Sequence, residues 1–84
     1  MNSEFYNKII NITPYKDDIA AMEKIIETVA RRGGSRVISD WTYNNELIKC
    51  LEKHFQNEGF ATIVDFDGDD RSRVIIEWYR IDSL

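Results

Sequence analysis

Two β-rich runs in the second half of the chain constrain its fold more than any other feature. The runs "FATIVDF", residues 60–66, and "SRVIIEWYRI", residues 72–81, are separated only by residues 67–71. β-Branched and aromatic residues are typical of strands, whereas the glycine and aspartates between the runs are typical of turns. The sequence therefore predicts an antiparallel hairpin.

The predicted hairpin is apolar on both faces. Successive side chains of a strand point to opposite faces. Trp78 is therefore expected to be buried toward the helices, while Ile75, Tyr79 and Ile81 form the other face. So short a chain has few elements with which to cover a second apolar face. This face is the predicted contact surface for a protein partner, and it favours a homo-oligomer.

A first main helix is indicated before the hairpin. Pro14 suits the first helical position after an N-cap at Thr13, and Gly33 is expected to end the helix. Apolar residues recur between them at alternating steps of four and three, as on one face of a helix. These residues are Tyr15, Ile19, Met22, Ile26 and Val29. Residues 3–12 indicate a further short N-terminal helix, with a strand as the alternative.

A second main helix is predicted over residues 43–58. Asp40 or Thr42 is expected to cap its start, and Gly59 to end it. Residues 35–41, "SRVISDW", lie between the two helices and predict a short strand at a sheet edge. One face of the second helix is apolar and consists of Leu47, Cys50, Leu51, His54 and Phe55.

All 84 residues are expected to form a single small α+β domain. In it, two main helices pack on a three-stranded, mostly antiparallel sheet that ends in the hairpin. The formal net charge of −4 argues against non-specific binding to duplex nucleic acid, which requires a surplus of Lys and Arg on the contact face. A single cysteine cannot form an internal disulfide, and neither a signal peptide nor a membrane span is recognised. We therefore expect a cytosolic protein without a membrane partner.

The stretch "VDFDGDDR" is similar to the start of a calcium-binding loop. Asp65, Asp67 and Asp69 have the spacing of the first three ligands of an EF-hand. However, Asp70 stands where a glycine is needed and Ile76 where a bidentate glutamate is needed, and the flanks are strands. A hairpin turn without a metal ion is the better interpretation. Asp67, Asp69 and Asp70 at its tip are predicted to contact a basic partner.

Cys50 and His54 lie four residues apart on the second main helix. This spacing suits a thiolate with its base, or two metal ligands. A structural zinc site takes about four ligands, whereas the chain has one cysteine and one histidine. A place in the core is therefore favoured for both residues. We expect no catalytic residue, no metal site and no cofactor.

The arginines suggest an alternative function, contact with a nucleotide or nucleic acid. The segment "ARRGGSR", residues 30–36, has two glycines among three arginines, and both backbone N–H groups and guanidinium groups suit phosphate. It follows a helix C-terminus, where the helix dipole disfavours anions. A helix end with solvated arginines is the favoured interpretation. The alternative anion contact would use Arg31, Arg32, Arg36, Arg71 and Arg73.

A helix with spaced leucines is followed by Gly-Phe, a strand, an acidic turn and a strand ending in I-x-W. The residues of this pattern are Leu47, Leu51, Gly59, Phe60, Ile76 and Trp78. The pattern resembles that of many small phage-encoded proteins of uncharacterised function. This resemblance implies a phage or prophage origin, and such proteins are commonly virion components or inhibitors of a host enzyme or defence factor. We expect a non-catalytic protein-binding molecule in the host cytoplasm or the virion, rather than an enzyme.

Overall fold

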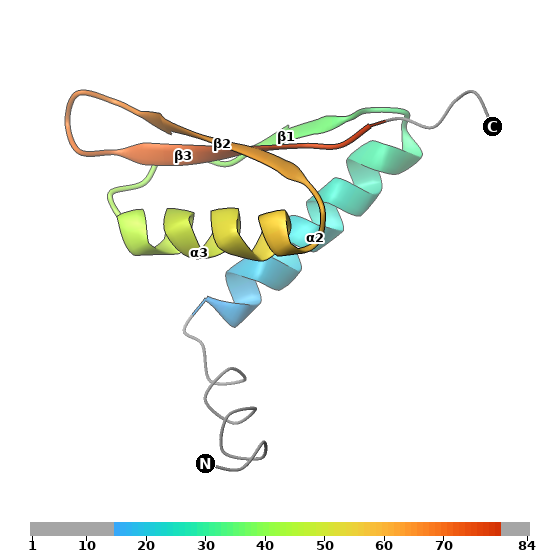
Figure 1. Ribbon diagram of the computed structural model, residues 1–84, viewed down its shortest axis with the longest axis horizontal. Helices are drawn as coiled ribbons and strands as arrows, with labels where there is room; N and C mark the ends of the chain where they lie inside the picture. Colours follow the sequence, from blue (N-terminus) through green and yellow to red (C-terminus); the bar gives the residue numbers. More distant parts are fainter. Residues whose placement is uncertain (1–14, 80–84) are drawn as a thin grey trace, which may run out of the picture.

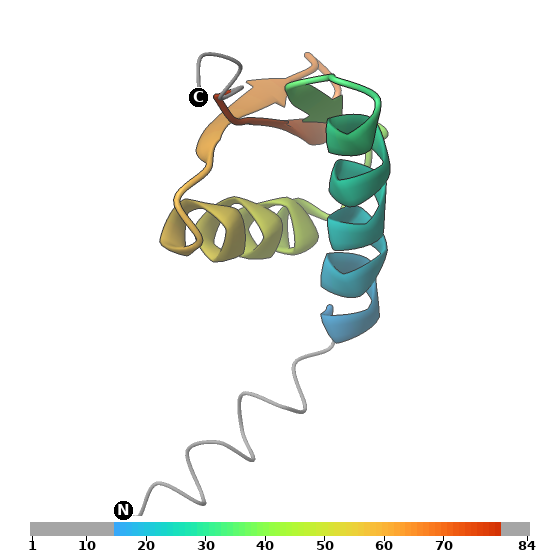
Figure 2. The same ribbon diagram turned by 90° about the vertical axis from the view of Figure 1, so that its right-hand side faces the viewer.

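The computed structural model describes residues 15–79, which form two helices and a three-stranded antiparallel sheet (Figure 1). In chain order the elements are α2 (Lys16–Arg31), β1 (Arg36–Ile38), α3 (Asn45–Asn57), β2 (Ala61–Phe66) and β3 (Ser72–Glu77). Both helices lie on one side of the sheet (Figures 1 and 2). This arrangement confirms the α+β prediction. The predicted helix over residues 3–12, and Thr13 with Pro14, lie outside the described residues.

The last strand of the chain is the centre of the sheet, whose order is β1-β3-β2. β3 pairs with β2 in the predicted hairpin and with β1 on its other side, and both pairs are antiparallel. β1 is therefore an edge strand, as predicted, and it covers Arg36–Ile38, a shorter part of the predicted residues 35–41. Beyond β1, Thr42 bridges to Ser72 through two backbone hydrogen bonds of 2.9 and 2.8 Å.

The apolar stripe of α2 faces the core, as predicted. Met22 and Ile26 are buried, and Ile19 and Val29 pack against the same core while partly exposed. The helix rises steeply toward the sheet and packs against β1, whereas α3 lies along the sheet beneath β2 and β3 (Figure 2). The two helices therefore cover the sheet unequally.

Each helix is followed by a glycine in the left-handed region. Gly33 after α2 has a φ of 86°, and Gly59 after α3 has a φ of 96°. Beyond α3, the Phe60 N–H donates to the Phe55 carbonyl oxygen at 2.9 Å, which is the long hydrogen bond of a Schellman motif. The predicted helix ends are thus confirmed, and Phe60 packs back toward the helix.

The predicted N-caps of α3 are wrong. The cap is Asn44, whose Oδ1 accepts a hydrogen bond from the Leu47 N–H at 3.1 Å. Thr42 does not cap the helix itself, because its Oγ1 accepts a hydrogen bond from the N–H of the cap residue Asn44 at 3.0 Å. Asp40 is exposed and lies farther from the helix start. The helix consequently begins at Asn45, two residues later than predicted.

The hairpin turn depends on its aspartates more than on its glycine. The Asp67 carboxylate accepts a hydrogen bond from the Asp69 N–H at 3.2 Å and forms an ion pair with Arg71. Asp70 has a φ of 67°, whereas Gly68 lies outside the left-handed region. Aspartate tolerates this region better than most residues, because its side chain can bond the local backbone. The turn therefore holds its shape through local side-chain contacts.

The core lies between the helices and the inner face of the sheet. Phe55 is at its centre, with an edge-to-face contact to Phe60 at 5.6 Å between ring centroids, and Phe60 contacts Trp78 in the same way at 5.9 Å. Ile48 is only 2% exposed, although it was not among the residues predicted for the apolar face of α3. The buried apolar residues are Met22, Ile26, Val37, Ile48, Leu51, Phe55, Val74 and Ile76.

Candidate functional site

The face of the sheet that points away from the helices carries a row of isoleucines. Along β3, Val74 and Ile76 are buried while the alternate residues point the other way. The strand registers place Ile38 of β1 and Ile63 of β2 on either side of Ile75. We call these three residues the isoleucine row and the surface around it the outer face. No described element covers this face (Figure 2).

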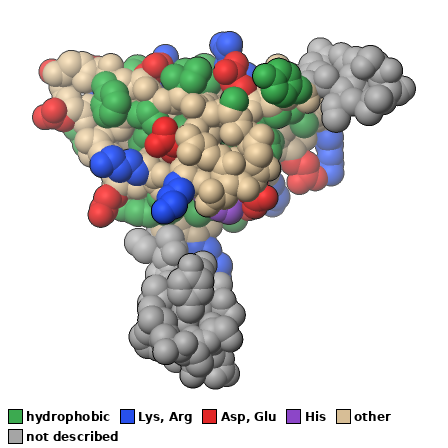
Figure 3. Space-filling model, viewed as in Figure 1, with side chains coloured by type: hydrophobic (Ala, Val, Ile, Leu, Met, Phe, Trp, Pro, Cys, Tyr) green, Lys and Arg blue, Asp and Glu red, His purple; other side chains and the backbone are tan. Residues whose placement is uncertain are grey.

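Ion pairs lie on both sides of the isoleucine row. Arg36 and Glu77 are opposite each other in register and pair at 3.1 Å, and Arg73 pairs with Asp65 at 3.1 Å. All four side chains are at least 31% exposed, so each pair stabilises the fold by only about 0–1 kcal/mol. The outer face thus has an apolar centre between charges of both signs. The same mixture of hydrophobic and charged side chains reaches the surface near the sheet in Figure 3.

Trp41 adjoins the outer face, because its ring centroid lies 4.4 Å from the guanidinium carbon of Arg73. Ile75 lies on the outer face, where the sequence predicted a contact surface. Tyr79 lies beyond the end of β3 and is 92% exposed, while Ile81 falls outside the described residues. Trp78 packs against the core on the helix side, as expected.

The acidic residues of the turn have two different roles. Arg71 lowers the pKa of Asp67 through a side-chain hydrogen bond, and the Asp69 N–H lowers it further. Asp67 is therefore engaged inside the turn. Asp69 and Asp70 are exposed at the tip of the hairpin, and only these two of the predicted acidic contact residues point freely to solvent.

The five arginines of the alternative anion contact are spread over separate places. Arg31 and Arg32 lie at the end of α2, where Arg31 pairs with Glu27. Arg36 lies opposite Glu77, which is four residues along β3 from Arg73. The backbones of Arg36 and Arg73 are therefore roughly 13 Å apart along the strand direction. Arg71 pairs with Asp67 in the turn, and the guanidinium carbons of Arg71 and Arg73 lie 5.8 and 4.4 Å from the same Trp41 ring centroid. The structure therefore brings these two arginines together but does not gather all five into one patch.

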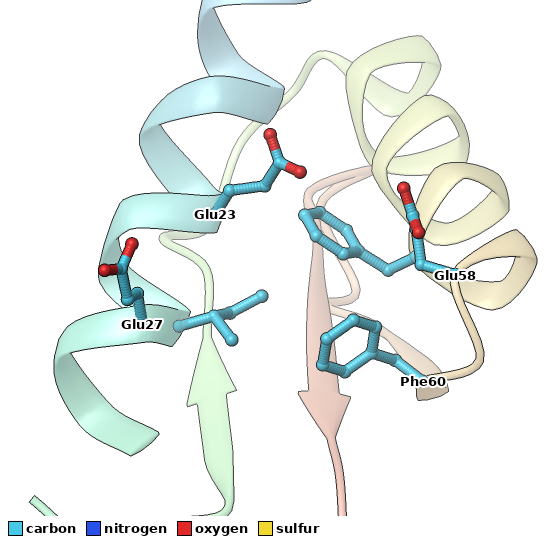
Figure 4. A pocket seen from close by; sticks show the side chains of 6 residues that line it. Glu23, Glu27, Glu58 and Phe60 are labelled. Atoms are coloured by element: carbon cyan, nitrogen blue, oxygen red, sulfur yellow. The ribbon is translucent and has the colours of Figure 1, made fainter. Parts of the chain in front are cut away.

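A second candidate site is a pocket of about 210 Å³ between α2 and the end of α3. In Figure 4, Glu23 and Glu27 come from α2, while Glu58 and Phe60 come from the end of α3 and the segment beyond it. The pocket has an apolar floor and an acidic rim. Its lining residues are Glu23, Ile26, Glu27, Phe55, Glu58 and Phe60.

His54 lies beside this pocket, between two of its glutamates. Its Nε2 is 3.8 Å from Glu23 Oε2 and 3.7 Å from Glu58 Oε1. The side chain is 31% exposed, yet Nε2 itself is buried and has no hydrogen-bond partner among the described residues. One oxygen of each glutamate and a ring nitrogen of His54 all lie within 4.8 Å of one another. We call these three residues the His–Glu cluster.

The structure groups His54 with glutamates, and Cys50 is not part of the cluster. Burial raises the pKa of the Cys50 thiol, and the carboxylate of Asp18 raises it further, so the reactive thiolate is disfavoured. His54 and Glu58 are four residues apart, one helical turn, and this spacing is a local sequence signal for their proximity that was not among the predictions. Glu23 lies on the other helix, and no local pattern connects it to His54.

No helix within residues 15–79 is both long and apolar enough to cross a membrane. Comparisons with protein-family models, curated proteins and solved structures found no match to this chain. A function therefore has to be inferred from the outer face and the pocket themselves.

Proposed function

We propose that the chain is a non-catalytic protein-binding module whose outer face binds the outer face of a second copy. The isoleucine row carries this proposal. Ile38 and Ile63, at its two ends, are 45% and 50% exposed, and antiparallel sheets ordinarily keep only one apolar face, which packs on the core. Two outer faces stacked as in a β-sandwich would bury both rows.

The charges beside the row favour one orientation of the two copies. A two-fold axis can relate the two copies in two ways. If it runs along the isoleucine row, perpendicular to the strands, Arg73 of each copy faces Glu77 of the other. With the axis along the strands, Arg73 would face Arg73 and Glu77 would face Glu77. Opposite charges across an interface attract, whereas like charges are costly. The axis therefore runs along the isoleucine row.

The size of the outer face limits the strength of this association. The sheet has three strands, the longer two of six residues, which gives a footprint of roughly 15 by 20 Å. A standard interface buries about 800 Å² on each partner. We therefore expect a weak dimer with a Kd in the micromolar range or above.

A binding role agrees with the resemblance to small phage-encoded proteins, which are commonly virion components or inhibitors. A host protein that used the isoleucine row would compete with the second copy, because both would cover the same residues. Such a partner would be detected as dissociation of the dimer.

The oligomeric state tests the proposal directly. Light scattering and sedimentation equilibrium, from about 5 µM to about 1 mM, should show a dimer that forms with increasing concentration. Ile63→Lys should make the chain monomeric throughout, because the charged lysine would be buried within the apolar interface. Ile25→Lys is the matched control, since Ile25 is 48% exposed on α2 and lies far from the outer face. A monomeric wild type, or equal loss in both variants, would overturn the proposal.

Charge reversal tests the orientation. Arg73→Glu alone and Glu77→Arg alone should each weaken self-association, because each places like charges across the interface. An equimolar mixture of the two variants should associate again, since a mixed dimer restores opposite charges at both contacts. If neither single variant weakens the dimer, the proposed axis is wrong.

A further inference from the structure

A buried nitrogen without a partner lies in the His–Glu cluster. His54 Nε2 has no hydrogen bond among the described residues, although two carboxylate oxygens stand 3.7 and 3.8 Å away. Buried polar atoms are nearly always satisfied, so one that is not requires an explanation. A ligand between the imidazole and the carboxylates would supply the missing partner.

We propose that Glu23, His54 and Glu58 bind a divalent cation of the zinc class. Imidazole nitrogen and carboxylate oxygen bind zinc at about 2.0–2.2 Å, and tetrahedral coordination then separates the ligand atoms by about 3.4 Å. His54 Nε2 already stands 3.7 and 3.8 Å from the two oxygens. All three ligand atoms lie within 4.8 Å of one another, so closure on an ion requires movements of the glutamate side chains of about 1 Å.

The two helices position the ligands and leave one coordination position open. His54 is on α3 and Glu58, one helical turn later, is the C-cap of that helix, while Glu23 approaches from α2. The two glutamate side chains are 54% and 55% exposed, so they can rotate without disturbing the core. The adjacent pocket has room for a water molecule as the fourth ligand.

The ligand types select the metal. Calcium and magnesium prefer oxygen ligands alone, whereas an imidazole favours zinc and its neighbours in the first transition row. The two carboxylates balance the charge of a divalent ion. Glu27, the third glutamate of the pocket, is paired with Arg31 and is not a ligand.

Calorimetric titration of the full chain with zinc chloride, in a buffer that does not bind metals, tests this site. We expect one zinc ion per chain and no binding of calcium chloride. Even residues that only support a metal ligand contribute about 10–100-fold to affinity, so His54→Gln and Glu58→Gln should each weaken binding at least tenfold. Glu27→Gln is the matched control and should leave the affinity unchanged.

Cobalt(II) provides a second measurement, because its visible absorption changes with the ligands and their geometry. The cobalt spectrum of the wild type should be lost in His54→Gln. Equal zinc affinity in wild type and His54→Gln, or no zinc binding by the wild type, would show that the cluster is an ion pair only. Glu58 is exposed, so Glu58→Gln remains decisive if His54→Gln does not fold. Ile63→Lys, which disrupts the proposed dimer, should not change zinc binding. Zinc binding and dimerisation can therefore be tested independently.

Discussion

Replacing Phe55 with alanine should remove a large part of the stability of this domain. Phe55 is 1% exposed and its ring meets Phe60 edge to face at 5.6 Å. Truncation of a buried phenylalanine costs about 3–5 kcal/mol, and the lost aromatic pair adds about 0.5–1.5 kcal/mol. Proteins have about 0.05–0.15 kcal/mol of stability per residue, which for 84 residues is about 4–13 kcal/mol in total. The variant should therefore be close to unfolding in water.

Phe66 provides the control, because the same atoms are removed from a side chain that is 73% exposed. Phe66→Ala should change the free energy of unfolding by at most about 0.5 kcal/mol. Unfolding by urea can be followed by circular dichroism. Because the free energy of unfolding falls by about 1 kcal/mol per M of urea, the midpoint of Phe55→Ala should lie about 3 M or more below that of the wild type. Phe55→Leu, a milder change, provides a measurable transition if the alanine variant is already unfolded. Similar losses at Phe55 and Phe66 would refute the reasoning that burial determines the cost.

Two further predictions concern the turns. Gly59→Ala should destabilise the domain by about 1–2 kcal/mol, because Gly59 has a φ of 96°. Gly68→Ala should be neutral or stabilise the domain by up to about 1 kcal/mol, because the added methyl group would meet no atom within 4 Å. The urea midpoints of the two variants would show this difference. The pKa of Asp67 is lowered in the folded protein. The stability that its carboxylate contributes is therefore present above the ordinary aspartate pKa and is lost as the pH falls through the lower pKa of the folded state. Acid titration of stability should therefore show a smaller loss in Asp67→Asn than in wild type, while Asp69→Asn should behave as wild type.

The secondary structure could be predicted where the signal is local. The stripe of α2, the glycines after both helices and the hairpin depend on residues close in sequence, and all are confirmed. The N-cap of α3 was misplaced because "DWTYNN", residues 40–45, offers several capping side chains in a row. Asn44 is selected only because Thr42 is held by its bridge to Ser72, a tertiary contact that the local sequence does not reveal.

The candidate sites could be predicted only in part, because each joins separate elements. The alternation of β3 correctly assigned Ile75 to the outer face, whereas Tyr79 lies beyond the end of the strand and its assignment stays a prediction. Ile38 and Ile63 complete the row only because β1 and β2 pair with β3 in particular registers. The position of Glu23 beside His54 depends on how α2 crosses α3, and the hydrophobic periodicity of the two helices does not predict this crossing.

The position of the His–Glu cluster gives the proposed metal a structural role as well. α2 packs chiefly against the edge strand β1, whereas α3 packs against β2 and β3. An ion held by Glu23 from α2 and by His54 and Glu58 from α3 would join these two units directly. The sheet separates this ion from the outer face, so dimerisation would leave the pocket of each copy accessible. In this arrangement one side of the sheet would serve for association, while the proposed ion would stabilise the helices on the other side.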